Sequence, residues 1–185
     1  MALTESTMLP LGVEAPDFSL TDVVTGKTVH RDDFHNGKAL LVMFICTHCP
    51  YVKHIEKELA TLGADYESKA IAIVAIGSND AITYPDDNPA GLKQQAVQYG
   101  FKFPYLYDET QRVAKAYRAA CTPDFFLFDK DFRLAYRGQF DSSRPGSGIQ
   151  VTGEDLREAI DDVLAGKPVS ADQRASFGCN IKWKA

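Results

Sequence analysis

Hydrophobic residues form two uninterrupted runs in this chain, at residues 39–45 and 70–76. Each run has the length of a strand and is too short for a free-standing helix, and the lack of polar positions predicts strands buried on both faces. Between the runs, apolar residues recur from Val52 to Leu62 at spacings of three and four, which predicts a helix with one apolar face. This order predicts a right-handed crossover between two parallel strands.

Shorter patterns predict the elements around this unit. Extended segments at residues 17–20 and 28–30 flank a Thr-Gly-Lys turn and predict an N-terminal hairpin. Asn88 and Pro89 supply a cap and a first-turn proline for a helix that runs toward Tyr99.

The second half of the chain predicts two more helices and a hairpin. Asp108 is expected to cap one helix. Residues 125–128 and 133–136 then predict an antiparallel hairpin at an edge of the sheet. Thr152 and Asp155 have the capping-box spacing of a last helix.

Length and composition predict an ordinary globular protein. The 185 residues fit a single domain, with residues 167–185 as a C-terminal tail in which Ile181 and Trp183 alternate with lysines and predict an edge strand. The chain is 45% hydrophobic and 24% charged, which is a globular composition. Its net charge of -5, with acids and bases interspersed, argues against nucleic acid or an anionic membrane as a partner.

The cysteine content bears on the compartment. The N-terminus has no basic segment ahead of a hydrophobic region, and no apolar run approaches the length of a membrane span, so we expect a cytoplasmic protein. Thiols are mostly reduced there. The 4 cysteines therefore indicate catalysis or metal binding rather than a disulfide framework.

The segment from Cys46 to Pro50 lies between the first buried strand and its helix. Because proline is favoured at the first helical position, Cys49 is expected to be the helix cap, where free N–H groups and the helix dipole favour a thiolate. A dipole effect of about 2 kcal/mol would lower the pKa of Cys49 by roughly 1.5 units, from about 8.5 toward 7. A protonated His48 would lower this pKa further. We interpret Cys49 as a nucleophile and Cys46 as its candidate partner.

The C-x-x-C spacing beside an α/β pattern is typical of redox sites. Two other interpretations of the cysteine pair stay open. Cysteines are also common as inert core residues. Alternatively, Cys46 and Cys49 together with either His48 or His54 have the ligand types of a zinc or copper site.

The loop at residues 78–88 carries three acids. Their spacing lacks the ligand order of a dedicated calcium site, so we interpret the loop as solvated surface. The three acids are Asp80, Asp86 and Asp87.

Several motifs resemble the redoxin branch of the thioredoxin fold, which includes peroxiredoxin-like proteins and relatives of alkyl hydroperoxide reductase and thiol-specific antioxidant. They are Gly12, Ala15-Pro16-Asp17-Phe18, Leu20, Gly37-Lys38 and His48-Cys49-Pro50. The resemblance covers about residues 10–165, and the tail at 178–184 resembles a peroxiredoxin-like subgroup.

This resemblance implies a fold and an activity. The fold would be an α/β thioredoxin-like three-layer sandwich, with a mixed central sheet, helices on both faces and an N-terminal hairpin extension. The activity would be that of a thiol-dependent oxidoreductase without a cofactor. Its partners would be a protein or small-molecule disulfide, or a peroxide, and a thiol reductant.

The same resemblance assigns a substrate segment and shows two departures from the family pattern. Thr122 and Pro123 match the segment whose cis-proline lies beside the active cysteine and offers backbone groups to a substrate chain. Thioredoxins cap the helix with the first cysteine, whereas here Cys49 is the second. Peroxiredoxins have a threonine where this chain has Cys46, and no arginine can be assigned to polarise a peroxide. The expected substrate contacts are Thr122, Pro123, His48 and Pro50.

A second thiol must resolve the mixed disulfide or sulfenic acid that forms at Cys49. The candidates are Cys46, Cys121, two residues before the expected cis-proline, and Cys179, whose tail is long enough to reach any part of the domain. The leading hypothesis is a thiol-disulfide oxidoreductase. A peroxiredoxin-like thiol peroxidase is the second, and a Cys/His metal-binding protein is the third.

Overall fold

The two apolar runs form the centre of the sheet. In the computed structural model, which describes residues 3–185, β4 (Ala39–Phe44) pairs in parallel with β5 (Ile71–Gly77). Helix α1 (Pro50–Tyr66) connects them. The predicted strand, helix and parallel strand are therefore confirmed.

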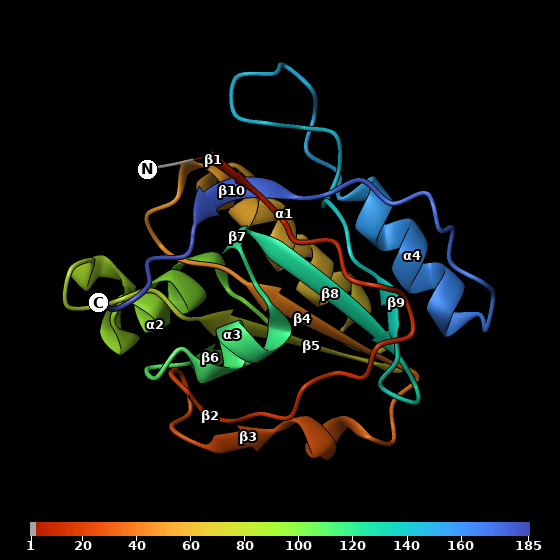
Figure 1. Cartoon of the computed structure of the whole chain (residues 1–185), viewed down its shortest axis with the longest axis horizontal. Coiled ribbons are helices and arrows are strands. Elements are labelled where there is room, and N and C mark those ends of the chain that lie inside the picture. The colour runs from red at the N-terminus through yellow and green to blue at the C-terminus, as the bar shows by residue number, and fades with distance from the viewer. Residues whose placement is uncertain (1–2) are drawn as a thin grey trace.

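Five further strands complete the central sheet, in the order β3-β2-β6-β5-β4-β8-β9. Strands β4, β5 and β6 are parallel, and the remaining pairs are antiparallel. The predicted N-terminal hairpin is β2-β3, and the predicted edge hairpin is β8-β9 (Figure 1). The added strands are β2 (Ser19–Asp22), β3 (Thr28–His30), β6 (Tyr105–Tyr107), β8 (Asp124–Asp129) and β9 (Leu134–Tyr136).

Helices cover both faces of this sheet. Helices α1, α2 and α4 pack on one face with Leu41 and Met43 of β4, and α3 packs on the other with Val42 and Phe44. The alternation follows from the period of two along a strand and gives the expected three layers with a mixed sheet. The helices are α2 (Pro89–Tyr99), α3 (Arg112–Tyr117) and α4 (Glu154–Leu164), with 3-10 turns η1 (Arg31–Phe34) and η2 (Pro85–Asp87).

A second, smaller sheet brings both ends of the chain together in the order β1-β10-β7 (Figure 1). Its strands are β1 (Leu3–Glu5), β10 (Phe177–Asn180) and β7 (Cys121–Thr122), all antiparallel. The predicted edge strand at Ile181 and Trp183 is wrong, because β10 ends earlier and lies between two other strands. Lys182 is buried and Trp183 is 42% exposed, so the period of two does not continue.

Two predicted helix starts are also wrong. The residue that caps α3 is Gln111 rather than Asp108, whose carboxylate accepts a backbone N–H inside the helix. Helix α4 is preceded by Gly153 at a φ of 68°, because the carboxylate of Asp141 accepts the N–H groups of both Thr152 and Gly153. Within residues 3–185, no helix combines the length and apolar composition needed to cross a bilayer.

Candidate active site

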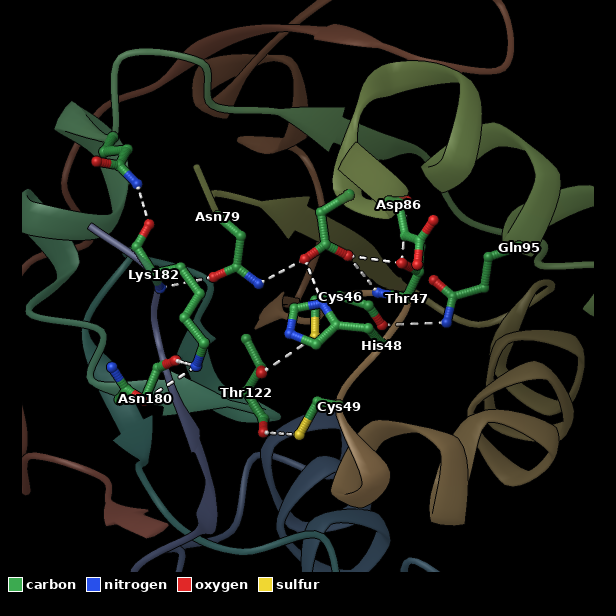
Figure 2. Close-up of polar contacts among 12 residues, drawn as sticks. Cys46, Thr47, His48, Cys49, Asn79, Asp86, Gln95, Thr122, Asn180 and Lys182 are labelled. Carbon is green, nitrogen blue, oxygen red and sulfur yellow. Dashed lines mark hydrogen bonds and ion pairs between the residues drawn. The ribbon is translucent and has the colours of Figure 1, made fainter. Parts of the chain in front are cut away.

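Cys49 caps α1 and Pro50 begins it, as predicted. The sulfur makes no capping hydrogen bond to the first turn of the helix. Instead the protonated Cys49 Sγ donates to the carbonyl oxygen of Thr122 at 3.2 Å (Figure 2). Cys49 therefore joins the start of α1 to β7.

The pKa of Cys49 is lowered to about 5. The largest cause is a hydrogen bond from Cys46; burial acts in the opposite direction, and a hydrogen bond from Cys179 adds to the lowering. The direction agrees with the sequence prediction, and the backbone N–H of Val52 in the first turn of α1 contributes as expected, but the largest cause is the Cys46 thiol, and His48 is not among the main causes. Burial and the contact with Cys49 raise the pKa of Cys46 well above its ordinary value. Cys46 therefore keeps its proton while Cys49 ionises.

The other two cysteines lie on the small sheet. Cys179 of β10 is the register partner of Thr122. Cys121 donates from its sulfur to the carbonyl oxygen of Pro123 at 3.6 Å. Burial raises the pKa of both thiols, that of Cys179 to about 12. Cys46 and Cys179 are thus the thiols whose interaction with the Cys49 sulfur lowers its pKa, and Cys121 is turned toward Pro123.

The peptide bond between Thr122 and Pro123 is cis, as expected from the family resemblance. Besides its carbonyl contact with Cys49, Thr122 places its hydroxyl oxygen 3.3 Å from the sulfur of Cys46. One residue therefore contacts both sulfurs of the C-x-x-C segment (Figure 2).

Asp87 belongs to the site, and its interpretation as a solvated loop residue is wrong. It is 2% exposed, and its carboxylate lies 2.7 Å from Nδ1 of His48 and accepts the backbone N–H of Thr47 at 2.8 Å. Burial opposes the charge of Asp87, but hydrogen bonds from His48 and Thr47 outweigh it and lower the pKa. Asp80 is also largely buried, whereas Asp86 is exposed as predicted. Only the position of Asp87 just before a helix start marks it in the sequence.

Asp87 also connects the cysteine segment to the C-terminus. Asn79 Nδ2 donates to Asp87, and the backbone N–H of Lys182 donates to Asn79 Oδ1, each at 2.8 Å (Figure 2). His48 stacks on Tyr84 at 5.2 Å between ring centroids, and Lys182 Nζ lies 5.7 Å from the Tyr84 ring. The C-terminal segment is therefore tied to the loop that carries the cysteines.

The potential metal ligands differ from the predicted set. Cys46, His48 and Asp87 place one ligand atom each within 4.8 Å of one another. Cys49 is outside this group, and Nε2 of His54 lies 3.0 Å from the hydroxyl of Ser143. Hydrogen bonds from Thr47 and Asn79 already engage the Asp87 carboxylate, so a metal ion at this group would have to replace them.

A cleft of about 520 Å³ lies beside Thr47 and His48, between α1 and α2. Its floor includes Gln95, which donates to the backbone carbonyl of Cys46 at 3.2 Å and to Glu56 at 3.1 Å. No cysteine of the described chain lines this cleft. It therefore reaches the backbone of the cysteine segment but not the sulfurs.

The buried arginine that pairs beside the substrate segment is Arg137, and its charge is already neutralised. Arg137 is fully buried and forms an ion pair with Asp124, next to Pro123. Its guanidinium also lies 3.9 Å from the centroid of the Phe126 ring. Among residues 3–185, no arginine is hydrogen-bonded to Cys49.

Comparisons with known proteins agree with this geometry. The AhpC/TSA family model matches residues 11–137. The thiol-disulfide oxidoreductase ResA of Bacillus thuringiensis (strain Al Hakam) is 28% identical over 159 residues, covering 84% of this chain and 78% of that protein. The crystal structure of an uncharacterized conserved protein from Geobacillus kaustophilus is 54% identical with a TM-score of 0.97, covering 100% and 97% of the two chains. A thioredoxin family thiol:disulfide interchange protein from Chlorobium tepidum TLS, 18% identical with a TM-score of 0.63 over 85% and 99% of the two chains, shares the fold.

Proposed function

The chain belongs to the AhpC/TSA family and is a thiol-dependent oxidoreductase, and we propose that it exchanges disulfides with Cys49 as the nucleophile. One observation carries this proposal: the Cys49 sulfur lies at the start of α1 against the carbonyl oxygen of Thr122, beside the cis Thr122–Pro123 bond, where interactions with Cys46 and Cys179 lower its pKa to about 5. At that pKa the sulfur is a thiolate at neutral pH, and the thiolate is the attacking species. The relatives named thiol-disulfide oxidoreductase support the same reaction class.

The reaction begins when the Cys49 thiolate attacks one sulfur of a substrate disulfide. A mixed disulfide forms at Cys49, and the other substrate sulfur leaves as a thiolate that takes a proton from water. Cys46 then attacks the sulfur of Cys49, so that a Cys46–Cys49 disulfide forms and the second substrate thiolate leaves, taking up the proton that Cys46 loses. An external thiol reductant restores the two thiols.

Cys46 is the preferred resolving thiol because the charge of Cys49 itself controls when Cys46 ionises. Contact with the Cys49 thiolate raises the pKa of Cys46 in the resting state. This cause disappears once Cys49 is in an uncharged mixed disulfide, and the Cys46 pKa then falls. The Cys121 sulfur donates to the carbonyl oxygen of Pro123, and the charge of Cys49 is only a lesser cause of its raised pKa, after burial and Asp124.

The two alternatives have less support. A peroxidase needs a cation to polarise the peroxide, and Arg137 is neutralised by Asp124. Metal binding would require the Asp87 carboxylate to give up hydrogen bonds from Thr47 and Asn79. A reducing compartment such as the cytoplasm stays a prediction.

The test is turnover of a disulfide-bonded model protein with excess dithiol reductant, for the wild-type chain and single serine variants. We expect Cys49→Ser to abolish turnover and Cys46→Ser to accumulate a mixed disulfide, seen as a mass increase on intact protein. Cys121→Ser should retain turnover. Activity that survives in Cys49→Ser, or peroxide consumption that outruns disulfide reduction, would contradict the proposal.

A further inference from the structure

Strand β10 covers the thiolate that the proposed function requires to be reachable. Cys49 is 0% exposed and Cys46 is 1% exposed. Disulfide exchange needs direct contact between the attacking sulfur and the substrate sulfur. Cys49 must therefore be uncovered before it can meet an external disulfide.

The register of the small sheet identifies what covers Cys49. Cys179 of β10 lies opposite Thr122, and the carbonyl of Thr122 contacts the Cys49 sulfur. If another extended chain pairs with β7 in this register, the residue of that chain that lies opposite Thr122 also lies beside Cys49. In the resting protein that residue is itself a cysteine, Cys179.

The residue before Cys179 shows how closely β10 approaches. A Cβ atom on Gly178 would lie 1.9 Å from the carbonyl oxygen of Thr122 and 3.1 Å from the nitrogen of Pro123. The obstacle is backbone, so rotation of a side chain cannot relieve it. This position beside the cis peptide bond therefore requires glycine for steric reasons.

The pairing of β10 with β7 is short, whereas β10 is also held by β1 on its other edge and by the bonds of Ile181 and Lys182 after it, so exchange with another chain means opening the β7 edge while β10 stays on β1. β7 has only 2 residues, and Ser176 adds one side-chain hydrogen bond to the carbonyl oxygen of Pro123 at 2.8 Å. Short strand edges of this kind are bound by extended peptides through backbone hydrogen bonds, with side-chain positions giving specificity.

We propose that β10 occupies the substrate-binding position beside Cys49 in the resting protein. The substrate is an extended polypeptide segment that carries a disulfide-bonded cysteine directly preceded by glycine. When β10 leaves β7, the substrate segment pairs with Thr122 and presents its cysteine sulfur to Cys49. The inference rests on the proposed function and narrows its substrate to extended protein chains.

The chemical step is the exchange already described. The Cys49 thiolate attacks the sulfur of the substrate cysteine, the Cys49–substrate bond forms, and the partner sulfur of the substrate leaves as a thiolate. Attack by Cys46 on Cys49 then releases the reduced segment.

The test uses a synthetic peptide with the sequence of residues 176–182, Ser-Phe-Gly-Cys-Asn-Ile-Lys. Its cysteine is joined to 2-nitro-5-thiobenzoate, an acidic thiol that leaves readily and absorbs visible light when released. Two matched probes carry the same group: a peptide with alanine in place of the glycine, and a peptide of the same composition in shuffled order. Release is measured by stopped flow with the reduced full-length protein, and release by Cys49→Ser is subtracted.

We expect the first peptide to react at least about tenfold faster than either matched probe, since the alanine Cβ would collide with the Thr122 carbonyl. Equal rates for the three peptides would overturn the inference while leaving the proposed function intact. If no probe shows release that depends on Cys49, the proposed function fails and this inference fails with it.

A variant of the chain tests the role of β10 directly. Ser176→Ala removes the hydrogen bond to Pro123 and should speed the reaction of the first peptide about fivefold, because the resident strand is held less tightly. Ser170→Ala, at an exposed position in the same tail, is the matched control and should leave the rate unchanged. Equal rates for Ser176→Ala and the wild-type chain would overturn the idea that β10 gates the site.

Discussion

Replacement of Cys46 by alanine should raise the pKa of Cys49. In the intact site that pKa is lowered to about 5, and the interaction with the Cys46 thiol is the largest cause. Alanine removes this donor without introducing another polar group. The thiolate of Cys49 then loses the strongest of the interactions that stabilise it.

The size of the effect follows from the strength of hydrogen bonds to charged groups. Such bonds contribute about 1.5–3 kcal/mol, which corresponds to roughly 1–2 pKa units. The pKa of Cys49 should therefore rise to roughly 6–7 in Cys46→Ala. At pH about 6 the thiolate fraction would fall from about nine-tenths to between about one-tenth and one-half.

The ultraviolet absorbance of thiolate measures this titration without requiring access to the sulfur. It is recorded against pH for reduced protein, and Cys49→Ser identifies the step that belongs to Cys49. Cys46→Ser is the matched control, because its hydroxyl still donates a hydrogen bond and should keep the Cys49 pKa nearer to the wild-type value.

Two results would refute the reasoning. If Cys46→Ala and the wild-type protein titrate at the same pH, the hydrogen bond from Cys46 is not what stabilises the thiolate. If the wild-type Cys49 step lies near the ordinary thiol pKa, the nucleophile assignment itself loses its support.

Three further predictions concern stability, each measured by urea unfolding of reduced protein. The lowered Cys49 pKa contributes stability that is fully present above the unfolded-state pKa and is lost as pH falls toward about 5. The free energy of unfolding of the wild-type protein should thus drop more than that of Cys49→Ser between pH about 8 and 5. Equal drops for the two proteins would contradict this. Asp124→Ala should cost roughly 3–5 kcal/mol, because it leaves Arg137 buried and unpaired; a cost under about 1 kcal/mol would show that the pair is dispensable. Asp87→Asn should lower the free energy of unfolding by about 2 kcal/mol, because bonds from His48 and Thr47 are lost. The control, Asp86→Asn at an exposed position, should change that free energy little. Equal effects of the two substitutions would argue against the buried network.

Local sequence patterns were sufficient for the central layers. The apolar runs at residues 39–45 and 70–76 could only be strands buried on both faces, and the proline after Cys49 fixed where α1 begins. The cis state of the Thr122–Pro123 bond came from the family resemblance, since the residues themselves do not distinguish cis from trans.

Other features depend on partners distant in sequence. Asp87 is the same residue type as its exposed neighbour Asp86. Only the packing of η2 against the cysteine loop buries Asp87. Likewise Lys182 follows an alternating pattern that predicts exposure, yet backbone bonds to Asn79 and Gln111 hold it inside.

The sequence alone determined the strand-to-helix corner and the cap position of Cys49, because these depend on short-range periodicity and backbone preference, while the redoxin character came from the resemblance of its motifs to that family. Only the tertiary structure decided which thiols lie close to one another and how far each is exposed to solvent. Cys179 reaches the site because the two ends of the chain pair in one small sheet, and it adds to the lowering of the Cys49 pKa that the nearby Cys46 mainly causes. Contacts of this kind depend on the summed geometry of the whole fold, which no local pattern encodes.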